Sequence, residues 1–202
     1  MLCVDREKMD EQKIYQEFIA AEAILKGHFI LSSGLHSDTY LQCARVLMDA
    51  KRAEKLCGEL ARKLREKITS EIDMVISPAM GGVVVGYEMG RQLGVPAIFC
   101  ERVDGSFALR RGFEIPLGAR ILLVEDVVTT GKSSLETVHC ITQHGGKVVA
   151  EASLIDRSCG AHGLPFPLVS LLTLEVPAYN ADALPEHLAN IPGVKPGSRW
   201  LK

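Results

Sequence analysis

One stretch of sequence decides the fold: Ile121-Leu122-Leu123-Val124-Glu125-Asp126-Val127-Val128-Thr129-Thr130-Gly131-Lys132-Ser133-Ser134. A short apolar run ends in two adjacent carboxylates, small hydroxyl residues and a glycine follow, and an amphipathic segment then begins. The pattern predicts a buried strand that leads through a tight loop to a helix N-terminus. Such an N-terminus suits a phosphate, because its N–H groups are unpaired and the helix dipole is positive there. The carboxylates suit sugar hydroxyls or a magnesium ion, so a sugar phosphate is the expected ligand.

Two simpler interpretations of this stretch compete with a ligand site. A P-loop needs a glycine five residues before Gly131, but that position holds Asp126, so the P-loop is excluded. An ordinary strand-to-helix turn with a Thr or Ser cap would explain Thr129 to Ser133. It would not explain Glu125 beside Asp126, because neighbouring carboxylates in a desolvated place repel each other unless a ligand or metal uses them. The ligand site is therefore favoured.

The composition excludes several classes of protein. The chain has 202 residues, 47% of them hydrophobic, which suffices for one α/β domain with a full core. A net charge of −2 gives no electrostatic footprint for nucleic acid, and no apolar run approaches a membrane span. The charged N-terminus lacks the apolar core of a signal peptide. The six cysteines form no CxxC pair, so we expect neither a zinc site nor disulfides, and a reducing, cytoplasmic location.

Predicted strands and helices alternate along the rest of the chain. Helices are expected at 14–26, 53–64, 83–93, 133–144 and around 182–190, and strands at 28–31, 39–41, 73–77, 97–100, 120–124 and 148–155, with a further apolar run at 168–173. This alternation predicts an α/β fold, with a mostly parallel sheet flanked by helices on both faces. Ligands of such sheets bind at the carboxyl ends of the strands. The loops that begin at Pro78, Glu125 and Asp156 are therefore expected to meet at one site.

Three further segments carry residues suited to anions. Pro78 to Gly82 is a glycine-containing loop before a helix, where the backbone can approach a ligand closely, although a plain connector is equally compatible. The polar segment from Glu101 to Ile115 is arginine-rich and has no helical period. We interpret it as a mobile lid that stabilises negative charge and excludes water, the alternative being a solvated hairpin whose arginines keep it soluble. Arg157, at the end of a strand, is either an ordinary surface charge or a partner for an acidic substrate.

The segment 121–134 closely resembles the ribose-phosphate signature of type I phosphoribosyltransferases, which transfer ribose 5-phosphate from 5-phosphoribosyl 1-pyrophosphate (PRPP) to a nitrogenous base with magnesium. The resemblance implies that Glu125 and Asp126 hold the ribose hydroxyls, with Mg²⁺ held mainly through PRPP. It also implies that the loop wraps the 5-phosphate and that Pro78 to Gly82 binds pyrophosphate. The PRPP-binding residues it implies are Met80, Gly81, Arg102, Glu125, Asp126, Val127, Val128, Thr129, Thr130, Gly131, Lys132 and Ser133.

Within that family the chain resembles the orotate phosphoribosyltransferases over nearly its whole length. Phe29 to Tyr40 is similar to their N-terminal signature, which forms a hood over the base, and 154–157 is similar to the strand end whose arginine binds the orotate carboxylate. The resemblance implies that Thr129 and Arg157 contact orotate. It also implies a single domain over 1–202, whose hood comes from about 1–45 and the C-terminal tail, and a homodimer in which the lid reaches the neighbouring site.

The chain also departs from the common orotate pattern. Many orotate enzymes carry lysines at the positions of Ser32 and Gly81, and a lid with a lysine and a histidine, all absent here. We expect Arg110 and Arg111 to take the charge role of that lid, so that Arg102, Arg110, Arg111 and Asp126 are the catalytic candidates. Three alternatives remain open: a neutral base as substrate, a PRPP-sensing regulator without turnover, and an enzyme that depends on a fused or partner decarboxylase.

Overall fold

The structure is a computed structural model that describes residues 8–31 and 33–195. Its main sheet has six strands in the order β5-β4-β3-β6-β7-β8. The strands are β3 (Met74–Pro78), β4 (Ala97–Val103), β5 (Ser106–Leu109), β6 (Arg120–Val128), β7 (Lys147–Asp156) and β8 (Leu168–Thr173). All pairs are parallel except β4 with β5, which form an antiparallel hairpin at one edge. The predicted mostly parallel α/β sheet is confirmed.

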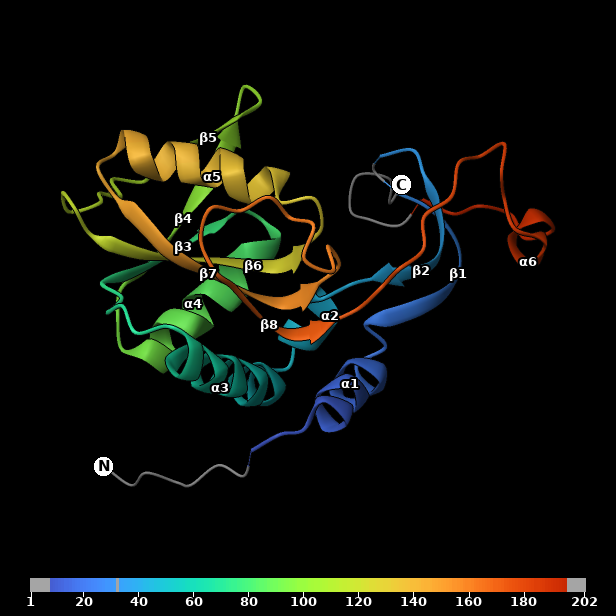
Figure 1. Ribbon diagram of the computed structural model, residues 1–202, viewed down its shortest axis with the longest axis horizontal. Helices are drawn as coiled ribbons and strands as arrows, with labels where there is room; N and C mark the ends of the chain where they lie inside the picture. The colour runs from blue at the N-terminus through green and yellow to red at the C-terminus, as the bar shows by residue number, and fades with distance from the viewer. Residues whose placement is uncertain (1–7, 32, 196–202) are drawn as a thin grey trace.

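Helices cover both faces of the sheet (Figure 1). α3 (Ala50–Lys67) and α4 (Gly81–Leu93) lie on one face, with α1 (Glu11–Ala20) against β8 and the short α2 (Ala44–Leu47) beside them, and α5 (Lys132–Gln143) lies on the other face. The alternation of side chains along β6 explains the two layers, because Leu122 and Val124 belong to the core under α3 and α4, whereas Ile121 and Leu123 belong to the core under α5.

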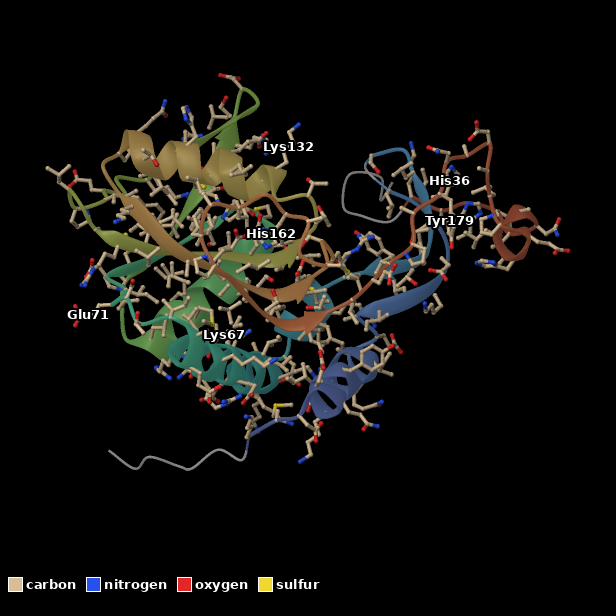
Figure 2. The ribbon with its side chains drawn as sticks, in the orientation of Figure 1. His36, Lys67, Glu71, Lys132, His162 and Tyr179 are labelled. Carbon is tan, nitrogen blue, oxygen red and sulfur yellow. The ribbon has the colours of Figure 1, made fainter. Side chains whose placement is uncertain are left out.

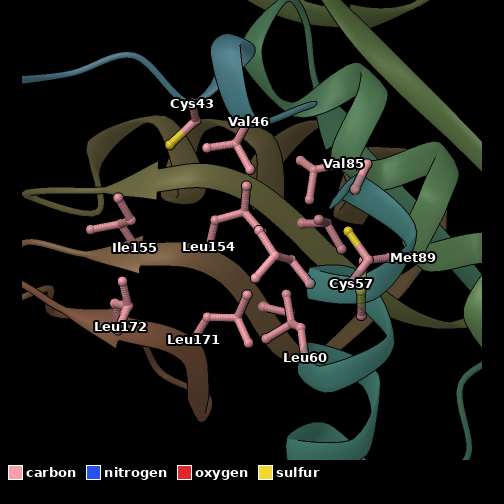
Figure 3. Packing of buried hydrophobic residues seen from close by; sticks show 14 of the residues in the cluster. Cys43, Val46, Cys57, Leu60, Val85, Met89, Leu154, Ile155, Leu171 and Leu172 are labelled. Carbon is pink, nitrogen blue, oxygen red and sulfur yellow. The ribbon is translucent and has the colours of Figure 1, made fainter. Parts of the chain in front are cut away.

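The larger core lies between the sheet and the α3–α4 layer (Figure 3). Leu60, Met89 and Leu154 are fully buried there and come from α3, α4 and β7. Residues Gly86 and Gly90 let α4 approach the sheet closely. A Cβ at Gly90 would lie 2.7 Å from the Cβ of Ala97 in β4, so the helix cannot carry a side chain there without moving. This packing fixes the start of α4 relative to the ends of β3 and β6.

Both ends of the chain contribute to a separate two-stranded layer, which we call the hood. Its strands β1 (Ile24–Ile30) and β2 (His36–Leu41) are antiparallel, and segment 177–194, with α6 (Glu186–Ala189), lies against them. His36 exchanges backbone hydrogen bonds with Tyr179, at 2.8 and 2.7 Å. Figure 2 labels both residues in the hood. The His28 imidazole lies 2.6 Å both from the Ile191 carbonyl and from His36 Nδ1.

Three predicted elements had the wrong boundaries, for reasons that the structure shows. The helix predicted over 14–26 ends at Ala20, because Glu22 adopts a positive φ of 49° and Ile24 pairs with Leu41 in the hood. The strand predicted over 120–124 continues through both carboxylates to Val128, paired with β7 along its length. The predicted helix around 182–190 is only one turn, α6. No helix in the described residues is long and apolar enough to cross a membrane.

Candidate active site

The loops that follow β3, β6 and β7 meet at the carboxyl edge of the sheet. These strands are neighbours, and the register pairs Val128 with Asp156, so Thr129 and Arg157 leave the sheet side by side. The Arg157 N–H donates to the Val128 carbonyl at 2.8 Å, which fixes the two loops together. The predicted meeting of the three loops is therefore observed.

The two carboxylates lie inside β6 and face opposite sides of the sheet. Asp126 faces α4: a Cβ built on Gly81 would lie 2.8 Å from both of its carboxylate oxygens. Glu125 faces α5, where the nearby Ser133 side chain favours its charged form and lowers its pKa against the effect of burial. This arrangement follows from the alternation of side chains along a strand. Each carboxylate thus stands at the start of a different helix, which the prediction of a strand ending at Val124 did not anticipate.

Neither carboxylate has a cationic partner among the described residues. Burial raises the pKa of Glu125 to about 8, and the charge of Asp126 adds to the rise. Burial likewise raises the pKa of Asp126, although the Val127 N–H donates to its carboxylate at 2.9 Å. Two carboxylates held out of water without a counter-charge are suited to receive hydroxyl donors or a cation.

The loop after β3 brings its backbone against Asp126. The peptide between Ala79 and Met80 is cis, Met80 is 84% exposed, and Gly81 begins α4. Because Gly81 has no Cβ, its backbone lies close to the Asp126 carboxylate, where a side chain would collide. The missing lysine at this position therefore has a physical reason, since a Cβ would meet both oxygens of Asp126.

The loop after β6 leaves the start of α5 open. Thr129, Thr130 and Lys132 are exposed, whereas Gly131 is buried, with a φ of 73° that suits glycine. A Cβ on Gly131 would lie 2.3 Å from the His162 carbonyl, so the loop after β7 packs against it; Figure 2 labels Lys132 and His162. The N-cap residue Gly131 has no side chain to cap α5. The Lys132 N–H donates to the Thr130 hydroxyl at 3.4 Å, whereas the N–H groups of Ser133 and Ser134 have no side-chain acceptor among the described residues and are available to an anion.

The guanidinium of Arg157 carries an unsatisfied donor. Its Nε is buried without a hydrogen-bond partner within the described part of the chain, and burial lowers the pKa of the side chain. A half-buried guanidinium whose buried Nε has no partner is unfavourable on its own and becomes favourable when an anion binds. Arg157 therefore has the surroundings of an anion-binding residue rather than those of a surface charge.

The predicted lid is the β4–β5 hairpin, with a turn at Asp104 and Gly105. Arg102 pairs with Glu136 of α5 at 2.5 Å and lies over the Phe107 ring, and Arg111 pairs with Glu101 at 2.5 Å. Arg110 is exposed. In a single chain, the structure thus brings Arg102 to α5, and neither Arg102 nor Arg111 contacts Glu125 or Asp126.

Two residues near the site, Cys43 and Glu151, were not anticipated from the sequence. Tyr40 of the hood and Cys43, which precedes α2, both lie near Asp126, whose charge adds to the effect of burial in raising the pKa of both side chains. Glu151 of β7 is fully buried, and it accepts a hydrogen bond from Ser134 of α5 at 2.7 Å. Burial raises the pKa of Glu151 to about 7. The sequence signal that could have revealed Glu151 is a single glutamate within the otherwise uncharged predicted strand 148–155.

The donor set fits magnesium only in part. Carboxylate oxygens are the ligands that Mg²⁺ prefers, and Glu125 and Asp126 supply them. The described residues contain no group of three or more His, Cys, Asp and Glu side chains able to form a metal cage. An ion at this edge would therefore be held jointly by the protein and a phosphorylated ligand.

Comparison with known proteins agrees with this geometry. The model of the phosphoribosyl transferase domain matches residues 46–181. An orotate phosphoribosyltransferase of Sphingopyxis alaskensis is 56% identical over 95% of this chain and 98% of its own length, and that of Parvibaculum lavamentivorans is 50% identical over 96% and 100%. Among solved structures, orotate phosphoribosyltransferase from Aeropyrum pernix superposes with a TM-score of 0.66 at 26% identity, covering 80% of this chain and 94% of that one. The Mycobacterium tuberculosis enzyme, solved with PRPP, gives 0.62 at 25% identity, covering 82% and 97%.

Proposed function

Because the chain belongs to the phosphoribosyltransferase family, and within it to the orotate phosphoribosyltransferases, we propose the following use of its residues in the reaction of orotate with PRPP. The products are orotidine 5-phosphate and pyrophosphate, in pyrimidine (UMP) biosynthesis. The enzyme is a pentosyltransferase, and the bond that breaks joins the ribose C1 to the pyrophosphate oxygen. Orotate supplies its own nucleophilic nitrogen, so no protein nucleophile is needed.

Glu125 and Asp126 bind the ribose hydroxyls from the two sides of β6. Their carboxylates support this role, because neither has a cationic partner among the described residues and each can accept further hydrogen bonds from hydroxyl donors. The backbone from Val127 to Ser133, with the hydroxyls of Thr129 and Thr130, receives the 5-phosphate at the uncapped start of α5. Met80 and Gly81 present backbone to the pyrophosphate beside Asp126.

Arg157 binds the orotate carboxylate, with Thr129 beside it. The support is the unpaired Nε of Arg157 and the hydrogen bond that ties its backbone to Val128. The hood covers the base, supported by the approach of Tyr40 to Asp126. We further propose that residues 1–202 act as one catalytic domain, in the cytoplasm.

Mg²⁺ is held mainly through PRPP, with Glu125 and Asp126 as its protein ligands. When bound, it neutralises charge on the phosphates. The acidic pair supports this assignment because carboxylate oxygens are hard ligands suited to that ion.

Arg102, Arg110 and Arg111 neutralise the departing pyrophosphate in the site of a second subunit. Within one chain, Arg102 and Arg111 pair with Glu136 and Glu101 instead, which supports a role across a homodimer. The exposed side chains of Met80, Val84 and Tyr87 recur at i, i+4 and i+7 on α4 and offer an apolar face for such a partner.

The single observation that carries the proposal is the pair of adjacent carboxylates between two helix N-termini, with Glu125 buried and Asp126 half-buried. Purified protein with PRPP and magnesium should consume orotate when orotate, uracil, xanthine, hypoxanthine and adenine are offered separately. Arg157→Ala should raise the KM for orotate at least about ten-fold, the usual scale of a lost charge-assisted hydrogen bond, and leave the KM for PRPP near its wild-type value.

The matched control is Arg120→Ala, because Arg120 lies at the opposite, amino end of β6, paired with Asp73. It should leave both KM values unchanged. Turnover of a neutral base would contradict the role of Arg157. Tight binding of PRPP without turnover of any base would favour a PRPP-sensing regulator instead.

A further inference from the structure

α5 begins without a side-chain cap at its N-cap position, as does α4, whereas α1 and α3 each begin with a capping aspartate. Asp10 caps α1 and Asp49 caps α3 through hydrogen bonds to N–H groups of the first turn. At α5 the N-cap is Gly131, which has no side chain to do so. A cap would occupy the donors that the 5-phosphate needs. The start of α5 therefore requires an anchor that leaves its N–H groups free.

Glu151 meets that requirement from beneath the helix. It is fully buried in β7, and its Oε1 accepts a hydrogen bond of 2.7 Å from the hydroxyl of Ser134, the third residue of α5. Ser134 itself is only 2% exposed. The bond uses the side chain of Ser134 and leaves the backbone N–H groups of Ser133 and Ser134 available, while the Lys132 N–H donates to Thr130 Oγ1 at 3.4 Å.

The neighbouring strand places a second glutamate beneath the preceding residue of α5. The Ser133 side chain lies near enough to Glu125 of β6 to lower its pKa. The register places Glu151 opposite Leu123, on the same α5 side of the sheet. Consecutive serines of α5 thus face glutamates on adjacent strands. Of the two glutamates, only Glu125 is part of the proposed ribose-binding site. Glu151 makes no contact there.

Burying the Glu151 carboxyl has a free-energy cost that an apolar residue would avoid. Its Oε2 is buried and has no hydrogen-bond partner among the described residues. Leaving a buried carboxyl oxygen unpaired is unfavourable, and an apolar side chain of similar size would pack in the same strand without that cost. A buried glutamate is therefore expected at this position only if its other oxygen, Oε1, makes a favourable contact, which here is the hydrogen bond from Ser134.

We propose that Glu151 is a positioning residue for the 5-phosphate of PRPP, acting through Ser134 to hold the first turn of α5 in its anion-binding orientation. The inference rests on the proposed function of the loop after β6. It assigns Glu151 no contact with substrate, and its effect should be confined to the end of PRPP that carries the 5-phosphate.

Two fragments of PRPP test this directly in binding experiments with the full chain. Glu151→Leu should weaken binding of ribose 5-phosphate and raise the KM for PRPP, each about ten-fold, as expected for one lost buried hydrogen bond. Binding of pyrophosphate and the KM for orotate should stay unchanged. Glu151→Gln keeps an acceptor oxygen and should restore ribose 5-phosphate binding to near the wild-type level.

Ser134→Ala removes the other half of the bond and should reproduce the effect of Glu151→Leu, with no further loss when the two changes are combined. It also carries the test if Glu151→Leu fails to fold. The matched control is Ser153→Ala, which removes a buried hydrogen bond of the same strand, to Ser170 at 2.6 Å, without touching α5. It should leave ribose 5-phosphate binding unchanged.

Equal weakening of ribose 5-phosphate and pyrophosphate would indicate general loosening and overturn the proposal, as would unchanged binding of ribose 5-phosphate in both Glu151→Leu and Ser134→Ala. A failure of the proposed function looks different, because the wild-type protein itself would then not convert orotate and PRPP.

Discussion

Replacing Glu125 with glutamine should stabilise the ligand-free protein at neutral pH while impairing its use of PRPP. Burial and the Asp126 charge raise the pKa of Glu125 from 4.5 to about 8 in the folded chain. A carboxyl whose folded pKa is raised gives stability that is fully present below its unfolded pKa and is lost as the pH rises through the folded pKa. Between these values the wild-type protein should lose about 1.4 kcal/mol of unfolding free energy per pH unit from this group.

The advantage of the variant should therefore grow from less than about 1 kcal/mol at pH 5 to about 3 kcal/mol at pH 7, because about 2.5 pH units separate pH 7 from the unfolded pKa. Urea unfolding of both proteins at pH 5, 6, 7 and 8 measures this difference. Taking the difference between the two proteins cancels the contributions of Glu151 and of other groups that titrate in both.

The control is Glu114→Gln, which removes an exposed carboxylate and should change stability by the same small amount at every pH. A Glu125→Gln advantage that stays constant from pH 5 to pH 8 would refute the reasoning. It would mean that the pKa of Glu125 is no higher in the folded protein than in the unfolded chain. The same variant should lose about 10- to 100-fold in kcat/KM for PRPP, the scale of a hydrogen bond to a charged group.

Three further substitutions test the geometry around the site. Gly81→Ala would place a Cβ 2.8 Å from both carboxylate oxygens of Asp126 and should lower kcat/KM for PRPP at least about ten-fold in steady-state assays; an unchanged value would show that the loop yields freely. Gly90→Ala would place a Cβ 2.7 Å from a Cβ of β4 and should cost about 1–3 kcal/mol in urea unfolding, whereas full stability would mean that α4 is not in tight contact with the sheet. His28→Ala should speed amide hydrogen exchange at Val194, in segment 177–194, without affecting exchange in the main sheet. Equal protection of Val194 in the variant and the wild-type protein would show that the His28 side chain does not hold this segment.

The sequence predicted the central part of the fold well because that part depends on local periodicity. Apolar runs flanked by glycines give β3, β6 and β7, and the 3.6-residue period gives α3 and α5. The site at the carboxyl edge followed from the order of these elements. The acidic pair was recognisable because carboxylates next to a buried strand have no structural use of their own.

The remaining features depend on partners far away in the sequence. Ile24 and Leu25 continue the helical spacing of α1, yet they pair with Leu41 and Tyr40, and no local pattern indicates that choice. Segment 177–194 has little regular structure of its own. It is held by His28 and His36, which lie more than 140 residues earlier in the chain. These elements were predicted poorly because tertiary pairing overrides local preference.

The arginine-rich segment shows the same limit for function. Its composition indicates a role with anions, but composition does not reveal that Arg102 pairs with Glu136 of α5. The charged side chains of an edge hairpin form their ion pairs only after the sheet has assembled. Glu151 was overlooked for a related reason, because only the packing of α5 shows that its oxygen meets Ser134.

The joining of the hood from both chain ends has a consequence for synthesis. The main sheet is complete once Thr173 has been made, but β2 meets Tyr179 and β1 meets Val194 only after those later residues have been made. The hairpin of β1 and β2 must therefore wait, with its pairing edge open, while the sheet assembles. A nascent chain would acquire its sugar-phosphate site before the cover over its base, so the covered site arises only after Val194 has been synthesised.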